Sequence, residues 1–416
     1  MITKHICANG VRIVHERMPH VRSVALGIWI EAGSGDESDT EAGIAHFIEH
    51  MLFKGTATRT ARTIAEEFDR IGGDLNAFTS KDMTCFYATV LSEHAENALT
   101  ILEDMLFNST FDEVEMEKEK SVVLEEIATV EDMPDDDVHE QLWATMYPNN
   151  PIGKPILGNK ETITSFTKET IVHFMERLYR PERIVISIAG NCDDQLIGHI
   201  DKLFGSFKPK AELQIERTPE IPIFNPGVLL KEKRVEQTHI CLGFPSLAVS
   251  DDRLYDLVIL DSIIGAAMSS RLFQEVREER GLAYSIYSYF TAYAEAGSFI
   301  IYGGTSPDKT NELYNTIQSI IDSIVSDGVT EREIENVKEQ VIGGFLLGLE
   351  STESRMFRNG KNELMKQGHR STDEVVSDIR LVERLNVNKL AEEIFTGKRA
   401  ISVISTKETI DMIDFT

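Results

Sequence analysis

The sequence predicts an α+β protein built from two homologous domains of about 200 residues, each a mostly antiparallel sheet packed with helices. Three observations support this prediction. The chain has 416 residues, more than one core usually organises. Strand-like and helix-like segments are mixed along both halves. Segments of the first half also recur in the second half at a nearly constant offset.

Local patterns in the first half predict its elements in order. Residues 24–30 form a β-branched, apolar run that is typical of a strand, and residues 42–53 have the apolar spacing of a helix. Residues 75–90 are rich in Thr, Phe, Tyr and Val and predict a strand or a hairpin, whereas residues 111–130 predict a charged helix. This mixture favours an α+β sandwich.

Three segments of the first half recur in the second half at offsets of 216 or 218 residues. We interpret them as an internal duplication, because separate matches at nearly one offset rarely arise by chance. The matched pairs are residues 25–27 with 241–243, residues 183–187 with 399–403, and residues 113–117 with 331–335.

A stretch with several prolines near the middle of the chain predicts a linker between the two domains. The prolines of residues 207–227 are Pro209, Pro219, Pro222 and Pro226. We therefore predict an N-terminal domain of residues 1–215 and a homologous C-terminal domain of residues 216–416.

Composition narrows the classes of partner and compartment. A formal net charge of -27 repels phosphates, so we expect no nucleic-acid partner. Cys7, Cys85, Cys192 and Cys241 form no Cys-x-x-Cys pair, which indicates neither a disulfide framework nor a cysteine zinc site. The N-terminus lacks a secretory pattern, and no apolar run approaches the roughly 20 residues that cross a bilayer. We expect a cytoplasmic protein that does not bind membranes.

One short motif predicts a metal site. His46 and His50 are four residues apart inside the predicted helix, so their side chains share a face and can hold one zinc ion. Glu49 lies near the same face, where its carboxylate can take a proton from zinc-bound water. This is the inverted order of the commoner His-Glu-x-x-His motif. The competing interpretation is a polar helix face that happens to carry two histidines.

A catalytic zinc ion needs a third protein ligand, and the charged helix at residues 111–130 offers candidates. Glu119 and Glu126 are seven residues apart and lie on one face, so one could bind the metal while the other orients a histidine. By this reasoning Glu125 is nearly as good a ligand as Glu126. Most glutamates of this helix are expected to be solvated surface groups.

The duplication provides an internal comparison for these residues. At the offsets above, the second half carries no histidine or carboxylate at any of the matching positions, so the shared fold does not require the metal-binding groups. The matches are His46 with Ser262, Glu49 with Gly265, His50 with Ala266, Glu125 with Gly343 and Glu126 with Gly344.

Residues 46–55, His-Phe-Ile-Glu-His-Met-Leu-Phe-Lys-Gly, resemble the signature of the pitrilysin and mitochondrial-processing-peptidase family of inverted zincin metallopeptidases. The resemblance covers essentially the whole chain. It implies one zinc ion per chain, held by His46, His50 and Glu126, because the third ligand of this family follows the second histidine by about 76 residues. It also implies that Glu119 supports the site and that Glu49 is the general base.

The same resemblance implies residues that bind the substrate. Residues 73–80 are similar to the edge strand of the family, onto which a peptide adds as an extra strand, and Phe53, Asn76, Ala77 and Phe78 are the expected contacts. In the second half, Arg277 and Tyr284 resemble the pair that holds substrate near the scissile bond and stabilises the oxyanion. On spacing alone, Arg277 would be one member of a charged helix at residues 275–280.

We predict a zinc-dependent endopeptidase that hydrolyses peptides or unfolded segments inside a dimeric chamber, with Glu49 as the general base. The homodimer is implied by the resemblance, because family members of this length pair. On this interpretation residues 1–215 are catalytic, and residues 216–416 contribute substrate-binding groups without a metal site. One alternative is a peptide-binding or assembly subunit that needs a different partner chain for activity. Another is a zinc hydrolase that acts on other substrates.

Overall fold

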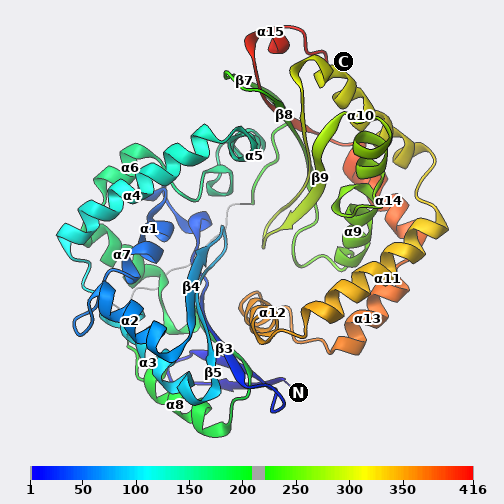
Figure 1. Ribbon diagram of the computed structural model, residues 1–416. Coiled ribbons are helices and arrows are strands. Elements are labelled where there is room, and N and C mark those ends of the chain that lie inside the picture. Colours follow the sequence, from blue (N-terminus) through cyan, green and yellow to red (C-terminus); the bar gives the residue numbers. More distant parts are fainter. Residues whose placement is uncertain (1, 209–220, 416) are drawn as a thin grey trace. The chain divides into compact units, whose positions relative to one another are not determined.

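The computed structural model describes residues 2–208 and 221–415, and these contain two β-sheets, each in its own compact unit (Figure 1). Within the described residues, the first unit comprises residues 2–127, 155–208 and 347–369, and the second comprises residues 128–154, 221–346 and 370–415. The predicted boundary between residues 215 and 216 lies outside the described residues, as do Pro209 and Pro219 of the predicted linker.

The sheet of the first unit has the strand order β1-β2-β6-β3-β5-β4. One pair, β2 with β6, is parallel, and the others are antiparallel. The strands are β1 (Ile2–Ile6), β2 (Arg12–Arg17), β3 (Ser23–Ile30), β4 (Asp74–Thr79), β5 (Thr84–Leu91) and β6 (Ile184–Gly190). The helices are α1 (Ile44–Leu52), α2 (Ala61–Ile71), α3 (Ala95–Asn108), α6 (Lys160–Ser165), α7 (Lys168–Leu178), α8 (Asp194–Phe204) and α12 (Thr352–Leu364).

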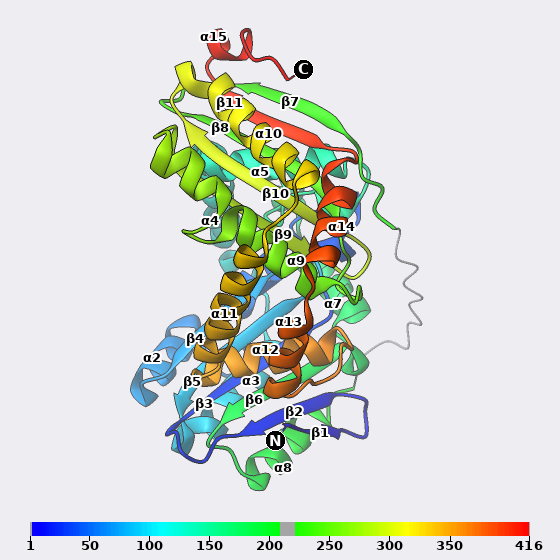
Figure 2. The same ribbon diagram turned by 90° about the vertical axis from the view of Figure 1, so that its right-hand side faces the viewer.

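The sheet of the second unit has the order β7-β11-β8-β10-β9, with β7 and β11 parallel (Figure 2). Apart from β1, it repeats the topology of the first sheet strand for strand. The strands are β7 (Gly227–Glu232), β8 (Thr238–Ser246), β9 (Ala283–Ala292), β10 (Gly297–Thr305) and β11 (Ala400–Ser405). The helices are α5 (Pro134–Met146), α9 (Leu254–Asp261), α10 (Thr310–Ser326), α13 (Thr372–Leu381), α14 (Arg384–Phe395) and α15 (Lys407–Ile410), with π-helical turns at Ser262–Ala266 and Phe273–Glu279.

The expected duplication and the α+β class are therefore confirmed. The predicted strand at residues 24–30 is β3, and residues 75–90 form the hairpin β4–β5. The charged helix is α4 (Glu113–Asp132), and its counterpart is α11 (Glu331–Gly348). The matches hold element by element and not residue by residue: Gly27 pairs with Ser187, whereas Gly243 pairs with Ala400, three residues away from the position that an offset of 216 gives.

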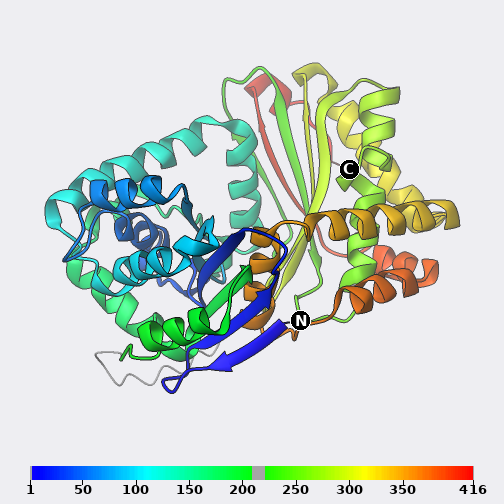
Figure 3. The same ribbon diagram turned by 60° about the horizontal axis from the view of Figure 1, so that its bottom comes forward.

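Both faces of each sheet are buried. In β3, Leu26 and Ile28 belong to one apolar cluster and Ala25 and Trp29 to another, as the alternation of side chains along a strand requires. Helices such as α1, α3 and α7 cover the first face. Helix α12 covers the second face by packing on β2, β3 and β6, and Figure 3 shows this orange helix against the blue and green strands.

The second unit is covered in the same way. Ile240, Leu242 and Phe244 of β8 face a cluster that includes residues of α9, α10 and α14, while Cys241 faces α5. Helix α5 comes from the first half of the sequence and α12 from the second, so each compact unit includes one helix from the other half. The sequence did not predict this exchange. None of the helices in residues 2–208 and 221–415 has both the length and the apolar composition that a membrane crossing requires.

The contact between α12 and β3 depends on glycine. A Cβ atom at Gly360 would lie 2.1 Å from Trp29 Nε1, and one at Gly27 would lie 2.3 Å from Met356 Sδ. We expect Gly360→Ala to lower the melting temperature, because overpacking of this kind costs about 1–3 kcal/mol. Gly344→Ala in α11 is the matched control: a Cβ there meets open space, so alanine should stabilise the helix by up to about 1 kcal/mol. Thermal unfolding followed by circular dichroism measures both, and equal melting temperatures would contradict the packing described.

Candidate metal centre

Helix α1 is fixed at its N-terminus by a buried carboxylate. The helix follows Gly43, whose φ of 90° lies in the left-handed region. Glu37 is 3% exposed, and its oxygens accept hydrogen bonds from the N–H groups of Gly43 at 2.8 Å and Ala45 at 2.9 Å. Burial raises the pKa of Glu37 to about 8, although both N–H groups favour its ionised form. Two free N–H groups of the helix end are satisfied in this way.

The two faces of α1 differ in polarity. Phe47, Ile48, Met51 and Leu52 are buried in the core of the first unit. The other side carries the histidines, and the ring centroids of His46 and His50 lie 4.4 Å apart. Burial and the neighbouring His50 lower the pKa of His46 to about 4, so its imidazole is neutral at pH 7, which is the form that binds metals.

Glu126 of α4 meets both histidines. Its Oε2 lies 3.9 Å from Nε2 of His46 and 3.7 Å from Nε2 of His50. Both distances exceed those of a hydrogen bond. Three ligand atoms therefore converge without bonding to one another, and they form a group able to hold a metal ion. Glu125, the competing candidate, is exposed.

The donor set fits zinc. Zinc binds imidazole nitrogen and carboxylate oxygen at about 2.0–2.2 Å in a tetrahedron, which separates neighbouring ligand atoms by about 3.3 Å. The observed separations of 3.7 and 3.9 Å require only a small closure of the three side chains. Three protein ligands also leave one position for water, as catalytic zinc sites do.

Glu119 orients one of these histidines. Its Oε1 lies 2.7 Å from His50 Nδ1, which leaves His50 Nε2 to face Glu126, and its Oε2 lies 2.6 Å from Lys54 Nζ. Burial acts to raise the pKa of Glu119, but the hydrogen bonds from His50 and Lys54 hold it below its ordinary value. Burial acts to lower the pKa of His50, and Glu119 and Glu126 raise it overall. A carboxylate behind a ligating histidine is a recurring feature of zinc sites.

Glu49 also lies on α1. Burial raises the pKa of Glu49 although Thr79 of β4 donates a hydrogen bond to its Oε2 at 2.5 Å. In the described part of the chain, the second oxygen of Glu49 has no hydrogen-bond partner. A carboxylate with one oxygen fixed and a raised pKa is suited to accept a proton near neutral pH.

The predicted substrate residues lie on or near an edge strand. Strand β4 is the last strand of its sheet and pairs only with β5 within the described residues. Asn76 is exposed, and Ala77 and Phe78 are half-buried. The N–H of Ala77 donates to Asn76 Oδ1 at 2.8 Å, which indicates that this N–H faces the open edge. Phe53 instead packs on Phe86 and the core, with ring centroids 6.3 Å apart.

Arg277 and Tyr284 meet one another in the second unit. Arg277 Nη1 donates to the backbone oxygen of Tyr284 at 3.1 Å, and its guanidinium lies 4.4 Å from the centroid of the Tyr284 ring. Tyr284 is 78% exposed. The predicted charged helix around Arg277 is the π-helical turn Phe273–Glu279.

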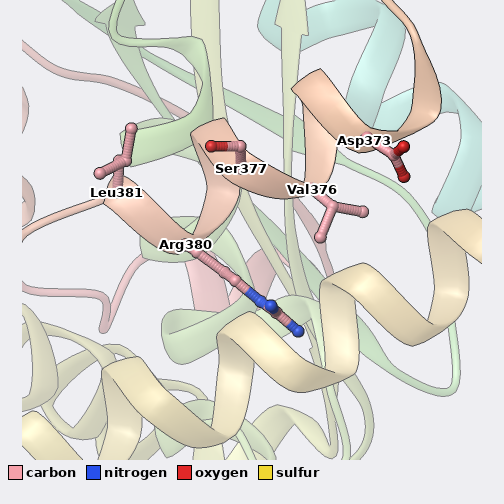
Figure 4. Close-up of a pocket in the computed structure, with 5 residues that line it drawn as sticks. All are labelled: Asp373, Val376, Ser377, Arg380 and Leu381. Carbon is pink, nitrogen blue, oxygen red and sulfur yellow. The ribbon is translucent and has the colours of Figure 1, made fainter.

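Two other features were compared with this centre. His5, Cys7 and Asp201 also bring ligand atoms together, but hydrogen bonds from His5 and Cys7 to Asp201 account for their proximity. A cavity of about 340 Å³ lies along α13 (Figure 4). It contains no histidine and no group with a perturbed pKa that could act in catalysis. Its lining residues are Asp373, Val376, Ser377, Arg380 and Leu381.

The sequence analysis missed three residues of this centre. Glu37, Lys54 and Thr79 contact α1, Glu119 and Glu49 respectively. Lys54 and Thr79 stand inside the two segments that carry the resemblance, so both were visible but had no assigned role. Glu37 lies seven residues before the helix begins, and no local signal identifies it as the group that caps α1.

Comparison with known proteins gives related chains and folds. Residues 12–160 match the family model described as insulinase (peptidase family M16), and residues 165–341 match the model described as the peptidase M16 inactive domain. The chain is 50% identical over 405 residues to "Uncharacterized zinc protease YmxG" of Bacillus subtilis (strain 168), with 97% of this chain and 98% of the relative covered. It is 37% identical over 408 residues to "Uncharacterized zinc protease ML0855" of Mycobacterium leprae (strain TN), with 97% and 92% covered.

A solved structure shares the fold over nearly the whole chain. The crystal structure of a protease from Helicobacter pylori superposes with a TM-score of 0.92 at 21% identity and covers 97% of this chain and 99% of its own. At this identity the likeness is one of fold.

The geometry generates a prediction about metal binding. We expect Glu126→Ala to lose zinc, because one of three converging ligands is removed, whereas Glu125→Ala on the same helix should keep it. Glu119→Gln should retain all three ligands but weaken zinc binding about 10–100-fold, because His50 loses the carboxylate that orients it. Elemental analysis and zinc titration measure these effects. Equal zinc content in the Glu125 and Glu126 variants would contradict the ligand set.

Proposed function

This chain belongs to peptidase family M16, and from that premise we propose that it is a zinc-dependent endopeptidase that cuts extended peptides and unfolded segments. The observation that carries the proposal is the convergence of His46, His50 and Glu126 at distances of 3.7 and 3.9 Å, too long for hydrogen bonds and close to those of ligands sharing one ion. The names of the relatives as zinc proteases support it.

The residues of this chain divide the chemistry among them. When bound, the zinc ion lowers the pKa of a water molecule and polarises the scissile carbonyl. Glu49 takes the proton from the attacking water and passes it to the leaving nitrogen, so that the peptide bond breaks without a free charge on either product. Glu119 keeps His50 Nε2 directed at the ion.

The open edge of β4 is the proposed seat of the substrate. A peptide that adds to this edge as an extra strand is held by backbone hydrogen bonds, so its sequence matters little and its extended conformation matters greatly. The Ala77 N–H, which now bonds to Asn76 Oδ1, is the donor that a substrate carbonyl would take over. This mode of binding favours unfolded segments over folded proteins.

We further propose that the active enzyme is a homodimer in which Arg277 and Tyr284 serve the metal centre of the partner subunit. The metal-binding set lies within residues 46–126, and the pair lies in the second unit. An exposed tyrosine hydroxyl and a guanidinium can bind a substrate carbonyl and its developing oxyanion. The alternative, an assembly subunit without activity of its own, leaves the complete ligand set unexplained.

The role of Glu49 can be tested at constant metal content. We expect Glu49→Gln to bind zinc as the wild type does but to lower kcat by at least about 10²–10⁴-fold, because the base is removed while the ligands remain. Turnover of a quenched fluorescent peptide and elemental analysis measure the two properties. A chelator should abolish wild-type turnover and added zinc should restore it. Near-normal turnover in Glu49→Gln would rule out the mechanism.

The shared site can be tested by complementation between two inactive variants. One variant carries Glu49→Gln, and the other carries Arg277→Ala with Tyr284→Phe. Each homodimer should be nearly inactive. After subunit exchange, the mixed dimer combines the intact pair of the first variant with the intact metal centre of the second, so one of its two sites works and activity returns to at most half of wild type. Tagged pull-down verifies exchange. If exchange occurs and no activity returns, the pair does not act across subunits.

A further inference from the structure

We infer that Thr79 is a positioning residue that connects the edge strand β4 to Glu49, so that a peptide seated on β4 fixes the base for catalysis. The inference rests on the proposed peptidase function and adds a role for a residue with no ligand or base function of its own. Thr79 is the last residue of β4, and Glu49 lies on α1. These two elements are in contact.

The hydrogen bond between the two residues is direct and short. Thr79 Oγ1 donates to Glu49 Oε2 at 2.5 Å, and no other hydrogen bond to the Glu49 side chain occurs within the described residues. A carboxylate on a two-carbon stem can rotate about three bonds, so one fixed oxygen determines where the other points. The orientation of the base therefore depends on this single hydroxyl.

The hydrogen of Thr79 is free for this purpose. Across the β4–β5 pair, Thr79 lies opposite Thr84, and their hydroxyl oxygens are 3.5 Å apart. Thr84 is fully buried and its hydroxyl donates to the backbone oxygen of Ala32 at 2.9 Å. A hydroxyl has one hydrogen, so Thr84 cannot serve Glu49, and Thr79 is the donor that can.

Strand β4 contacts both the substrate side and the catalytic side. Residues two apart on a strand point their side chains to the same face. Ala77 packs its methyl group on the core of the first unit, and Thr79 reaches α1 from the same face. The Ala77 N–H meanwhile faces the open edge. A peptide that pairs with β4 adds fixed hydrogen bonds to a strand that has a neighbour on one side only, and it thereby restrains Thr79 two residues away.

Two substitutions at position 79 separate hydrogen bonding from shape. Thr79→Val keeps the β-branched side chain and removes the hydroxyl, whereas Thr79→Ser keeps the hydroxyl. We expect Thr79→Val to lower kcat about 10–100-fold, the effect of one hydrogen bond to a charged group. The Michaelis constant, the zinc content and the affinity of the metal-free protein for a fluorescent peptide should stay near the wild-type values. Thr79→Ser should recover most of the lost kcat.

A double-mutant cycle with Ala77→Pro tests the coupling itself. Proline removes the N–H at the open edge, so peptide affinity of the metal-free protein should fall while zinc content is kept. If a seated peptide fixes Thr79, the loss of kcat caused by Thr79→Val should be smaller in the Ala77→Pro background than in the wild type. Losses that simply multiply would overturn the coupling, and so would equal kcat values for Thr79→Val and wild type.

The outcome also distinguishes this inference from the proposed function. If the wild type cleaves peptides with zinc, and Glu49→Gln does not, the function stands whatever Thr79→Val does, and an unchanged Thr79→Val enzyme overturns the inference alone. If the wild type with one zinc ion per chain cleaves no extended peptide, both the function and the inference fail. Loss of zinc from Thr79→Val would show a role in metal binding and would overturn the inference as well.

Discussion

Burial of both faces of each sheet is the constraint on which the rest of the fold depends. The central strands β3 and β8 alternate between two apolar clusters, so a helix layer on one side only would leave an apolar face in water. Helix α12 covers the second face of the first sheet and α5 that of the second sheet. Each of these helices comes from the opposite half of the sequence. Two repeats that exchange helices in this way cannot fold as two independent contiguous halves.

The metal centre is built from carboxylates that would be costly to bury alone. An isolated buried charge loses several kcal/mol of hydration, and only close partners compensate for it. Glu37 is compensated by two N–H groups of α1, Glu119 by His50 and Lys54, and Glu49 by Thr79. These partners fix the N-terminus of the helix, one ligand and the base in turn. The same hydrogen bonds that make burial tolerable therefore also supply the precision that catalysis needs.

Comparison of the halves shows which of these groups the fold itself requires. In α4 the ammonium of Lys120 meets Glu117, and in α11 Lys338 meets Glu335, at the offset of 218 residues. At that offset Glu119 corresponds to Val337, which is buried. The fold thus accepts an apolar side chain where the first unit buries a carboxylate. Residues 254–266, which include α9, contain no histidine. One repeat retained the geometry of the scaffold, and the other carries the chemistry on it.

The sequence by itself determined the features that depend on short-range periodicity. Four-residue spacing puts His46 and His50 on one face of a helix whatever surrounds it, and alternating apolar runs specify strands buried on both faces. Similar segments in the two halves revealed the duplication. Only the tertiary structure decided which partners meet across long separations. The rotation of α4 against α1, set by side-chain packing, brings Glu126 rather than Glu125 to the histidines. Capping of α1 by Glu37, the contact of Thr79 with Glu49, and the exchange of α5 and α12 also follow from packing between distant segments, which no local pattern encodes.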